Sequence, residues 1–229
     1  AINFKDLFGE VDSEAVERME KEVTENDTSV IIYTSGTTGK PKGANITHKS
    51  ILSSSKAQAE HTSCKDSDVI MGHMPLNHVG GLTCGVLTAM HALASVVLVP
   101  VFIPNVVLDA IQRNRATIFG GVPTMYQMLF NTNFDDYDVS SLRLMIIGGS
   151  NAPPELLRKI REKFPNARIM NLYGLSESSG ACICSPLEDD VERLMDERGI
   201  LSLEFRWMTT KSELLMMREI HCQMERSVK

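Results

Sequence analysis

Short runs of apolar, often β-branched residues alternate along this chain with longer stretches whose apolar positions recur every three or four residues. The first pattern is typical of buried strands and the second of helices packed on one face. This order predicts an α/β fold with a mostly parallel sheet and helices on both faces. Strands are predicted at residues 30–33, 69–71, 95–99, 117–119, 144–147 and 168–171. Helices are predicted at residues 50–60, 82–93, 106–114, 123–131 and 154–164.

The segment 12–27, before the first predicted strand, is rich in acidic residues and is expected to form an exposed, linker-like helix. In parallel sheets ligands bind at the carboxyl ends of the strands. Each notable loop of this chain directly follows a predicted strand, so a site is expected at that sheet edge. The predicted organisation is a lead-in of residues 1–26, a core of residues 27–190 and a tail of residues 191–229.

The composition excludes several classes of protein. The 229 residues are 43% hydrophobic and 23% charged, which is ordinary for a globular protein with a core. A net charge of −6 without a basic stripe argues against a nucleic-acid partner. The apolar segment 86–103 contains His91 and Pro100, so a buried helix and strand are predicted there and not an integral membrane protein. Five irregularly spaced cysteines and the lack of a signal-peptide pattern predict a cytoplasmic protein without a disulfide framework.

A loop rich in hydroxyls, glycines and lysines follows the first predicted strand. Backbone N–H groups and hydroxyls in such a loop form an anion-binding concavity, and lysines supply countercharge. A Walker A loop does not fit, because Thr34 stands where its first glycine is required and Pro41 follows Lys40. A Ser/Thr/Gly linker without a ligand is the alternative. The candidate nucleotide-binding residues are Thr34, Ser35, Gly36, Thr37, Thr38, Gly39 and Lys40, with Lys42 as a candidate catalytic cation.

Five sequence blocks, in order, resemble the adenylate-forming superfamily of acyl- and aryl-CoA synthetases, luciferase-like enzymes and peptide-synthetase adenylation domains. The loop at residues 33–43 resembles its phosphate-binding signature. Its P-L-x-H, G-V-P-T, adenine-loop and Y-G-x-T-E segments are resembled by residues 74–81, 120–125, 148–153 and 171–177. The resemblance covers the predicted core and implies part of the large N-terminal domain of an acyl-CoA-synthetase-like fold.

The resemblance implies that the chain binds ATP and Mg²⁺ and joins a carboxylic acid to AMP, before coenzyme A accepts the acyl group as a thioester. Glu177 is the implied catalytic acid and Mg²⁺ ligand, because a hard cation prefers carboxylate oxygen. Tyr173 is expected to stack on the adenine. Ser176 keeps the hydroxyl of the threonine that is usual in this family, whereas Ser150 and Asn151 replace a frequent Ala-Pro. The implied nucleotide-binding set is completed by Gly149, Asn171 and Gly174.

A second group of residues is implied to bind the acid. His78 is the candidate catalytic residue that orients the carboxylate or gates its entry, and a structural role is the alternative. The implied apolar substrate pocket contains Val79, Gly121, Val122 and Met125. A fatty acid is the favoured substrate, with an aryl or amino acid as the alternative. Outside the enzymes, the alternative is a non-catalytic nucleotide-binding remnant.

The tail from about Asp190 does not follow the family pattern. A full ligase is expected to continue with a ribose-binding aspartate, a hinge and a C-terminal domain bearing a catalytic lysine. If the possible codons are read again in a frame that starts at each third base, Trp207-Met208 must encode Asp and Met224-Glu225 must encode Gly. These residues resemble the family's sequence in this region. A shifted reading frame beginning between residues 192 and 199 is predicted, with a divergent amphipathic tail as the alternative. The chain is expected to be an incomplete copy with little or no activity alone.

Overall fold

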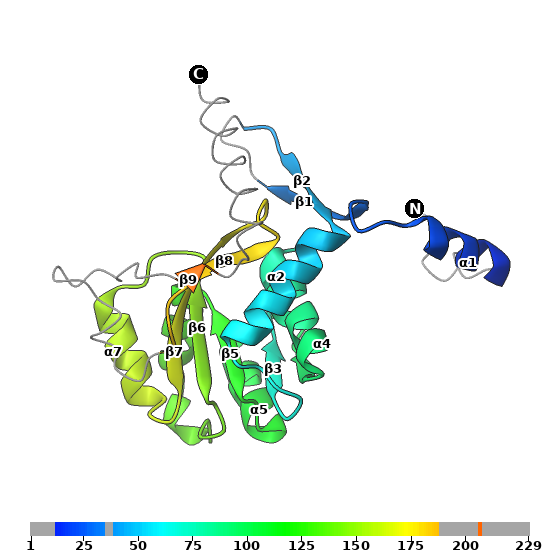
Figure 1. The fold of residues 1–229 in the computed structure, drawn as a ribbon. Coiled ribbons are helices and arrows are strands. Elements are labelled where there is room, and N and C mark those ends of the chain that lie inside the picture. Colours follow the sequence, from blue (N-terminus) through cyan, green and yellow to red (C-terminus); the bar gives the residue numbers. More distant parts are fainter. Residues whose placement is uncertain (1–11, 35–38, 188–205, 208–229) are drawn as a thin grey trace.

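The chain folds around a seven-stranded sheet (Figure 1). A computed structural model describes residues 12–34, 39–187 and 206–207. The predicted shift of reading frame and most of the predicted tail lie outside the described residues, as do residues 1–11 and 35–38. The sheet has the order β4-β3-β5-β6-β7-β8-β9. Its strands are β3 Val69–Gly72, β4 Ser95–Leu98, β5 Ile118–Gly121, β6 Leu144–Gly148, β7 Arg168–Leu175, β8 Gly180–Cys184 and β9 Arg206–Trp207.

The strands from β4 to β7 are parallel to one another, and β8 and β9 are added antiparallel. The prediction of a mostly parallel sheet is therefore confirmed. The predicted strand at residues 168–171 is longer in the structure, because β7 continues to Leu175 and pairs with β8 as a hairpin. This hairpin carries the predicted Y-G-x-T-E block at its tip.

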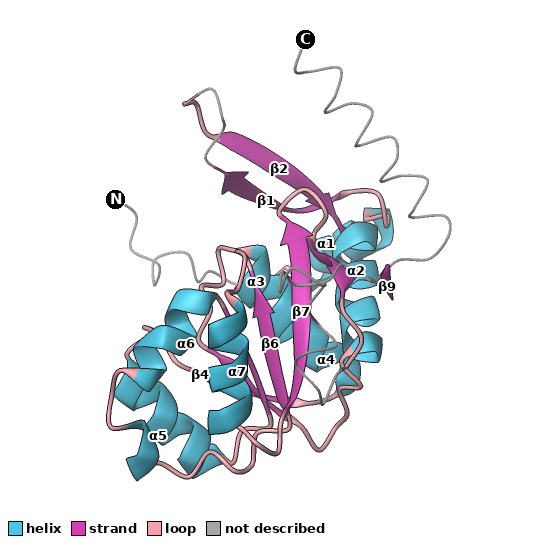
Figure 2. Ribbon diagram, turned by 90° about the vertical axis from the view of Figure 1, so that its left-hand side faces the viewer, coloured by secondary structure: helices cyan, strands magenta, loops and turns pink. Residues whose placement is uncertain are grey.

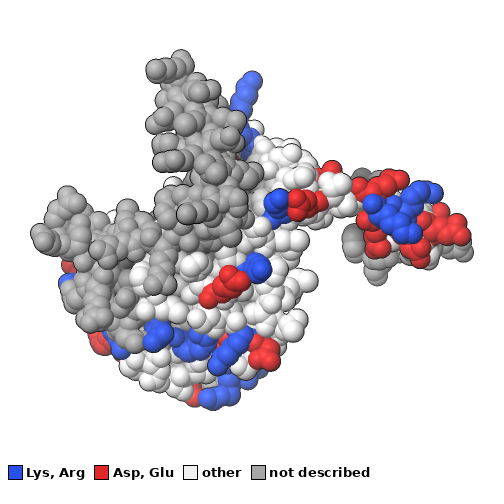
Figure 3. Space-filling view, in the orientation of Figure 1, with Lys and Arg blue, Asp and Glu red and all other residues white. Residues whose placement is uncertain are grey.

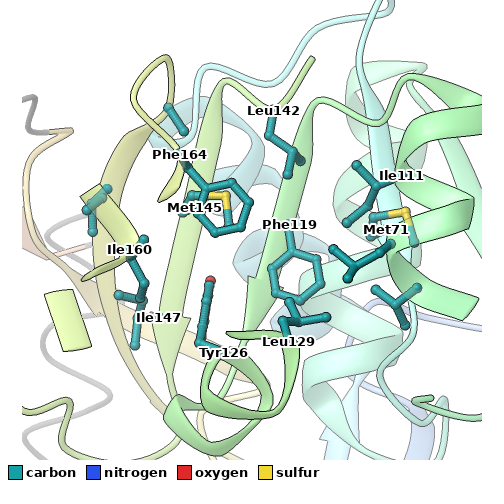
Figure 4. Packing of buried hydrophobic residues seen from close by; sticks show 14 of the residues in the cluster. Met71, Ile111, Phe119, Tyr126, Leu129, Leu142, Met145, Ile147, Ile160 and Phe164 are labelled. Atoms are coloured by element: carbon teal, nitrogen blue, oxygen red, sulfur yellow. The ribbon is translucent and has the colours of Figure 1, made fainter. Parts of the chain in front are cut away.

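Helices cover both faces of the sheet, as predicted. On one face α5 (Pro104–Asn114), α6 (Pro123–Phe130) and α7 (Pro154–Lys163) pack on side chains such as Phe119 and Met145 (Figure 4). On the other face α2 (His48–His61) and α4 (Thr88–Ala92) pack over a second cluster that contains Ile118 and Leu144. Neighbouring strand residues point to opposite faces, so a sheet covered on both faces needs strands that are apolar throughout.

The first predicted strand does not join this sheet, which corrects the sequence prediction. It forms β1 (Thr28–Thr34), which pairs antiparallel with β2 (Lys42–Thr47) in a separate two-stranded sheet (Figure 2). The seven residues 35–41 between the strands are too few for the crossover that parallel pairing requires. The predicted phosphate loop therefore lies at the end of a hairpin. Thr47 ends β2 and caps α2 in a capping box with Ser50, so the hairpin leads directly into that helix.

The helix predicted at residues 82–93 is divided into two short pieces in the structure, and a third piece precedes them. Residues Val79–Gly81 form α3, Leu82–Leu87 form a π-helical segment, η2, and α4 follows. Three glycines within residues 80–85 weaken a regular helix here. Gly81 also permits a close approach, because a Cβ atom there would lie 2.2 Å from the carbonyl oxygen of Pro75. Widened helical turns of this kind often occur at functional sites.

The predicted exposed helix near the start of the chain is confirmed as α1 (Ser13–Glu22), which buries none of its residues. It lies apart from the sheet in Figure 1. Asp12 caps it by accepting a hydrogen bond from the backbone nitrogen of Ala15 at 3.0 Å. Within the described part of the chain, no helix has both the length and the apolar character needed to cross a membrane.

The amino edge of the sheet is held by a buried ion pair. The Asp68 side chain is 1% exposed and accepts hydrogen bonds from two guanidinium nitrogens of Arg143. It also accepts from the Thr117 hydroxyl at 2.7 Å and from the Lys65 N–H at 2.9 Å. Burial alone raises the pKa of Asp68, but these hydrogen bonds outweigh it and hold the pKa below its usual value. The cluster joins the starts of β3, β5 and β6, on the side opposite the predicted site.

A histidine lies inside the core at the end of β3. His73 is 3% exposed, and its ring stacks on Phe119 with 4.5 Å between the ring centroids. Phe102 lies on it at 5.4 Å. Burial lowers the pKa of His73 from 6.5 to about 4, and the neighbouring carbonyl groups of Met71 and Gly120 oppose only part of that shift. His73 is therefore neutral at pH 7 and acts as a flat core side chain.

Candidate active site

The strand order creates a crevice between β3 and β5. From β3 the chain passes through α4 to β4 on one side, and then returns through α5 to β5 on the other side. The loops after β3 and β5 therefore leave the sheet in opposite directions. Such a switch point is where open α/β sheets bind their ligands.

A cavity of about 580 Å³ occupies this crevice. Its mouth is formed by the loops that follow β3, β5 and β6, and its walls by the sheet, α2, α3 and η2. Its size is that of an ordinary small-molecule pocket. None of the described residues that line it is Asp, Glu, Lys or Arg. Six of the predicted site residues line it: His78, Val79, Gly121, Val122, Gly149 and Gly174. Met125, a predicted pocket residue, does not line the cavity but lies behind Gly121.

His78 is placed at the mouth with a fixed ring. It lies at the N-cap of α3, and its Nδ1 accepts a hydrogen bond from the backbone nitrogen of Gly80 at 2.9 Å. With Nδ1 used as an acceptor, the neutral ring carries its proton on Nε2. The side chain is exposed, so the Nε2–H group can donate to an oxygen of an entering molecule. This geometry fits the predicted contact with a carboxylate.

Two loops at the mouth touch through Gly149. Its φ is +78°, and a Cβ atom there would lie 2.9 Å from Cγ1 of Val122. An L side chain at this position therefore meets both backbone strain and a clash. Gly39 has a similar φ of +81°, but nothing lies within 4 Å of a Cβ built on it.

Gly149→Ala is expected to lower the free energy of unfolding by on the order of 1–2 kcal/mol more than Gly39→Ala, because both variants are strained but only the first is crowded. Denaturant unfolding of the two variants measures the difference. Equal losses would show that Val122 moves aside without cost and that the two loops are not coupled.

Apart from Gly149 and Gly174, the described members of the predicted nucleotide-binding set do not line the cavity. Thr34, Lys40 and Lys42 belong to the β1–β2 hairpin, and a basic side chain (blue) projects from its end in Figure 3. The Thr34 hydroxyl donates to the carbonyl oxygen of Lys42 at 3.4 Å across the hairpin. Both lysine side chains are exposed. Ser35, Gly36, Thr37 and Thr38 lie outside the described residues.

The second half of the predicted nucleotide site lies on the β7–β8 hairpin. Asn171 and Tyr173 are in β7, and Tyr173 is 50% exposed, which leaves its ring face accessible. Ser176 and Glu177 are in the turn between the strands, with the Glu177 carboxylate exposed. In both ribbon views this turn lies beneath the β1–β2 hairpin (Figures 1 and 2). Ser150 and Asn151 follow Gly149 and are exposed beside the mouth.

The candidate metal ligands suit Mg²⁺ better than a structural zinc ion. The described residues contain no group of three or more His, Cys, Asp or Glu side chains that could hold an ion. A structural zinc centre in that region is therefore unsupported. A single exposed carboxylate such as Glu177 fits Mg²⁺, which usually keeps several waters and binds one or two carboxylates together with substrate phosphates.

Several cavity residues were not predicted from the sequence. Tyr33 lies immediately before the phosphate loop and lines the cavity, although it is 74% exposed. Its position at the head of the loop was the one available signal. Cys84 lines the cavity from η2, and burial raises its pKa to about 11, so its thiol is protonated and a poor nucleophile near neutral pH. The other unpredicted polar lining residues toward the inner end are Gln58, Thr62 and Thr88.

Comparison with known proteins shows the family of this chain. The family model described as "AMP-binding enzyme" matches residues 3–200. The chain belongs to the AMP-binding enzyme family. The matched interval is wider than the predicted core of residues 27–190, whose boundaries stay a prediction. Two similar proteins are 4-coumarate–CoA ligase 4 of Arabidopsis thaliana and the mitochondrial medium-chain acyl-CoA ligase ACSF2 of Bos taurus. The first is 33% identical over 77% of this chain, which spans 31% of its length. The second is 34% identical over 74% of this chain, which spans 28% of its length.

Solved structures of AMP-binding enzymes share the fold. The inhibitor-bound N-terminal domain of FACL13 from Mycobacterium tuberculosis matches with a TM-score of 0.69 and 26% identity, over 79% of this chain and 48% of that one. O-succinylbenzoate coenzyme A synthetase from Bacillus subtilis, in complex with ATP and a magnesium ion, matches with a TM-score of 0.65 and 30% identity, over 74% and 34%. The chain therefore spans about a third of the curated relatives named above and up to half of these structures.

Proposed function

We propose that this chain supplies the ATP- and acid-binding part of an enzyme that activates a carboxylic acid as an acyl adenylate and then transfers it to coenzyme A. The observation that carries the proposal is the position of an uncharged cavity at the switch point, with its mouth beside the loops of the predicted nucleotide site. Membership of the AMP-binding enzyme family supports the same activity.

In the proposed reaction a carboxylate oxygen attacks the α-phosphorus of ATP, and pyrophosphate leaves as the new O–P bond forms. The obstacle is electrostatic, because an anion approaches a polyanion, so the protein's contribution is positioning and charge stabilisation. Lys40 and Lys42 would neutralise the phosphates, and His78 Nε2–H would orient the carboxylate at the mouth. Glu177 would hold Mg²⁺, which supplies further countercharge when bound.

The walls of the cavity favour a neutral acyl group. An α-ammonium group buried here would need a carboxylate partner, and no described lining residue is Asp or Glu. Activation of an amino acid is therefore disfavoured within our proposal. Fatty and aryl acids both suit apolar walls, and the two relatives are described as a medium-chain acyl-CoA ligase and a 4-coumarate–CoA ligase. A fatty acid remains our first proposal and an aryl acid the alternative.

A cytosolic location belongs to the same proposal and rests on the irregular cysteine spacing. The bovine relative is described as mitochondrial. Location decides which pool of coenzyme A the whole enzyme would meet, and fractionation of cells expressing the tagged gene tests it.

Binding of ATP to the chain in the presence of Mg²⁺, followed by calorimetry, is the direct test. Glu177→Gln is expected to weaken this binding by on the order of 10–100-fold, because it removes one charge-assisted contact. Glu162→Gln, at an exposed acid of α7, provides the matched control and is expected to bind as the wild type does. Equal affinities for the two variants would remove Glu177 from the site.

Pyrophosphate release upon addition of octanoate contradicts the non-catalytic alternative. Release by the chain itself shows turnover, whereas ATP binding without release is expected both of an incomplete enzyme and of a nucleotide-binding remnant. Failure of the wild-type chain to bind ATP contradicts the proposal as a whole.

A further inference from the structure

Of the described residues that line the acyl cavity, three have buried polar side chains, namely Gln58, Thr62 and Thr88, and only Gln58 has a side-chain atom without a partner. Gln58 lies one turn before the end of α2, is 1% exposed and lines the cavity. Ile70 and Ile118, which also line the cavity, stand at the starts of β3 and β5, whereas His78 and Gly149 stand at the mouth. The carbonyl oxygen of Ser63, just after α2, accepts a hydrogen bond from Arg143 at the amino edge of the sheet. Gln58, one turn before the end of α2, therefore lies away from the edge at which the carboxylate would react.

The orientation of the Gln58 amide is fixed by a backbone group. Its Nε2 donates a hydrogen bond to the carbonyl oxygen of Cys84 at 2.9 Å. A carbonyl only accepts, so the amide nitrogen must face Cys84 and Oε1 must face elsewhere. Within the described part of the chain, Oε1 has no hydrogen-bonding partner. A buried acceptor in this state is costly unless a donor reaches it.

Two other polar groups that line the cavity, the hydroxyls of Thr62 and Thr88, already donate hydrogen bonds. The Thr62 hydroxyl donates to the carbonyl oxygen of Gln58 at 2.7 Å, and the Thr88 hydroxyl donates to that of Thr83 at 2.9 Å. Of the buried polar side-chain atoms that lack a partner in the described residues, Gln58 Oε1 alone belongs to a residue that lines the cavity. The inner end thus contains one buried acceptor without a partner, Gln58 Oε1, beside two threonine hydroxyls that already donate hydrogen bonds.

We infer that the cavity selects an acid that carries a hydroxyl group at the end remote from its carboxylate, and that Gln58 Oε1 accepts the hydrogen bond from this hydroxyl. The inference rests on the proposed function, because it assumes that the carboxylate lies at the mouth. A remote ammonium group is excluded by the lack of an acidic residue among the described lining. A plain alkyl or phenyl end leaves the acceptor without a donor.

Matched pairs of acids test this selection. The probes are 8-hydroxyoctanoate against octanoate, and 3-(4-hydroxyphenyl)propanoate against 3-phenylpropanoate. Each is titrated into the wild-type chain with Mg²⁺ and α,β-methylene ATP, which cannot release pyrophosphate. The hydroxylated member of at least one pair is expected to bind on the order of tenfold more tightly, as one well-placed hydrogen bond allows. The pair that shows the preference identifies the shape of the spacer.

Gln58→Met removes the acceptor and keeps an unbranched apolar side chain of similar length. It is expected to abolish or reverse the preference, because a hydroxyl then enters an apolar pocket without a partner. Gln127→Met makes the same exchange at an exposed position on α6 and is expected to keep the preference. If Gln58→Met fails to fold, which circular dichroism shows, the wild-type comparison of each pair still decides the question.

The outcomes separate the inference from the proposed function. Equal binding of both members of both pairs by the wild-type chain overturns the role of Gln58 and leaves acid binding intact. A preference that survives in Gln58→Met also overturns it. ATP binding without binding of any acid overturns the inference, and the nucleotide part of the proposed function stands. Absence of ATP binding contradicts the proposed function itself, and with it the inference.

Discussion

Arg143→Met is expected to lower the free energy of unfolding by about 3–5 kcal/mol, the usual cost of breaking a buried ion pair from one side. The reason is the partner that remains. The Asp68 side chain is 1% exposed, whereas that of Arg143 is 31% exposed. Removal of the guanidinium therefore leaves a carboxylate that cannot turn to water. Asp68→Ala is expected to cost less, because Arg143 can reach solvent when its partner is lost.

Denaturant unfolding of the variants checks this expectation. Asp109→Ala provides the control, since Asp109 pairs with Arg113 at 2.8 Å on an exposed helix face and such pairs contribute about 0.5 kcal/mol or less. The lowered pKa of Asp68 also fixes how stability depends on pH. The stabilisation by Asp68 is present above its usual pKa of 3.8 and is lost as the pH falls through the lower pKa of the folded state. A loss for Arg143→Met no larger than that for Asp109→Ala would show that water reaches Asp68.

The wild-type chain is expected to lose about 3 kcal/mol of stability in acid because of His73, and the His73→Leu variant is expected not to show this loss. The pKa of His73 is about 4 in the folded protein and near 6.5 when the chain unfolds. Between these values the unfolded chain binds a proton that the folded chain does not bind. Stability therefore rises with pH from about 4 to 6.5, and it is lost as the pH falls through this interval. Leucine has no such titration.

Unfolding curves for the wild type and the variant between pH 4 and pH 7 provide the measurement. As the pH falls across this interval, the wild type is expected to lose stability and the variant is not, so the free energy of unfolding of the variant rises relative to that of the wild type. His91→Gln removes an exposed histidine from α4 and is the control, because an exposed ring has no cost of burial. A difference that is constant with pH would show that protonated His73 is tolerated between Phe102 and Phe119.

The sheet and its helices were predictable because their physical cause is local. A strand covered on both faces must be apolar at every position, and runs such as 144–147 meet that condition without ambiguity. The β1–β2 hairpin was missed because the apolar alternation of β2 is limited to Ala44 and Ile46. The break at η2 depends on the contact of Gly81 with the Pro75 carbonyl, which the sequence does not encode locally.

The candidate site was predictable where it depends on loops and less so where it depends on packing. Blocks with unusual residue types pointed to His78, Val122 and Gly149, and the structure brings these three to one cavity. Gln58 gave no signal, because a glutamine in a helix is ordinarily exposed. Its burial follows from the contact of α2 with η2, two elements whose meeting is set by the tertiary fold.

Helix α2 connects the β1–β2 hairpin to the cavity. Its first turn is capped by Thr47 at the base of the β1–β2 hairpin, and its last turns carry Gln58 at the floor of the cavity. Fourteen helical residues make a rod about 21 Å long, which resists bending. A molecule that presses on the floor of the cavity thus acts at one end of a stiff element whose other end is capped at the base of the β1–β2 hairpin.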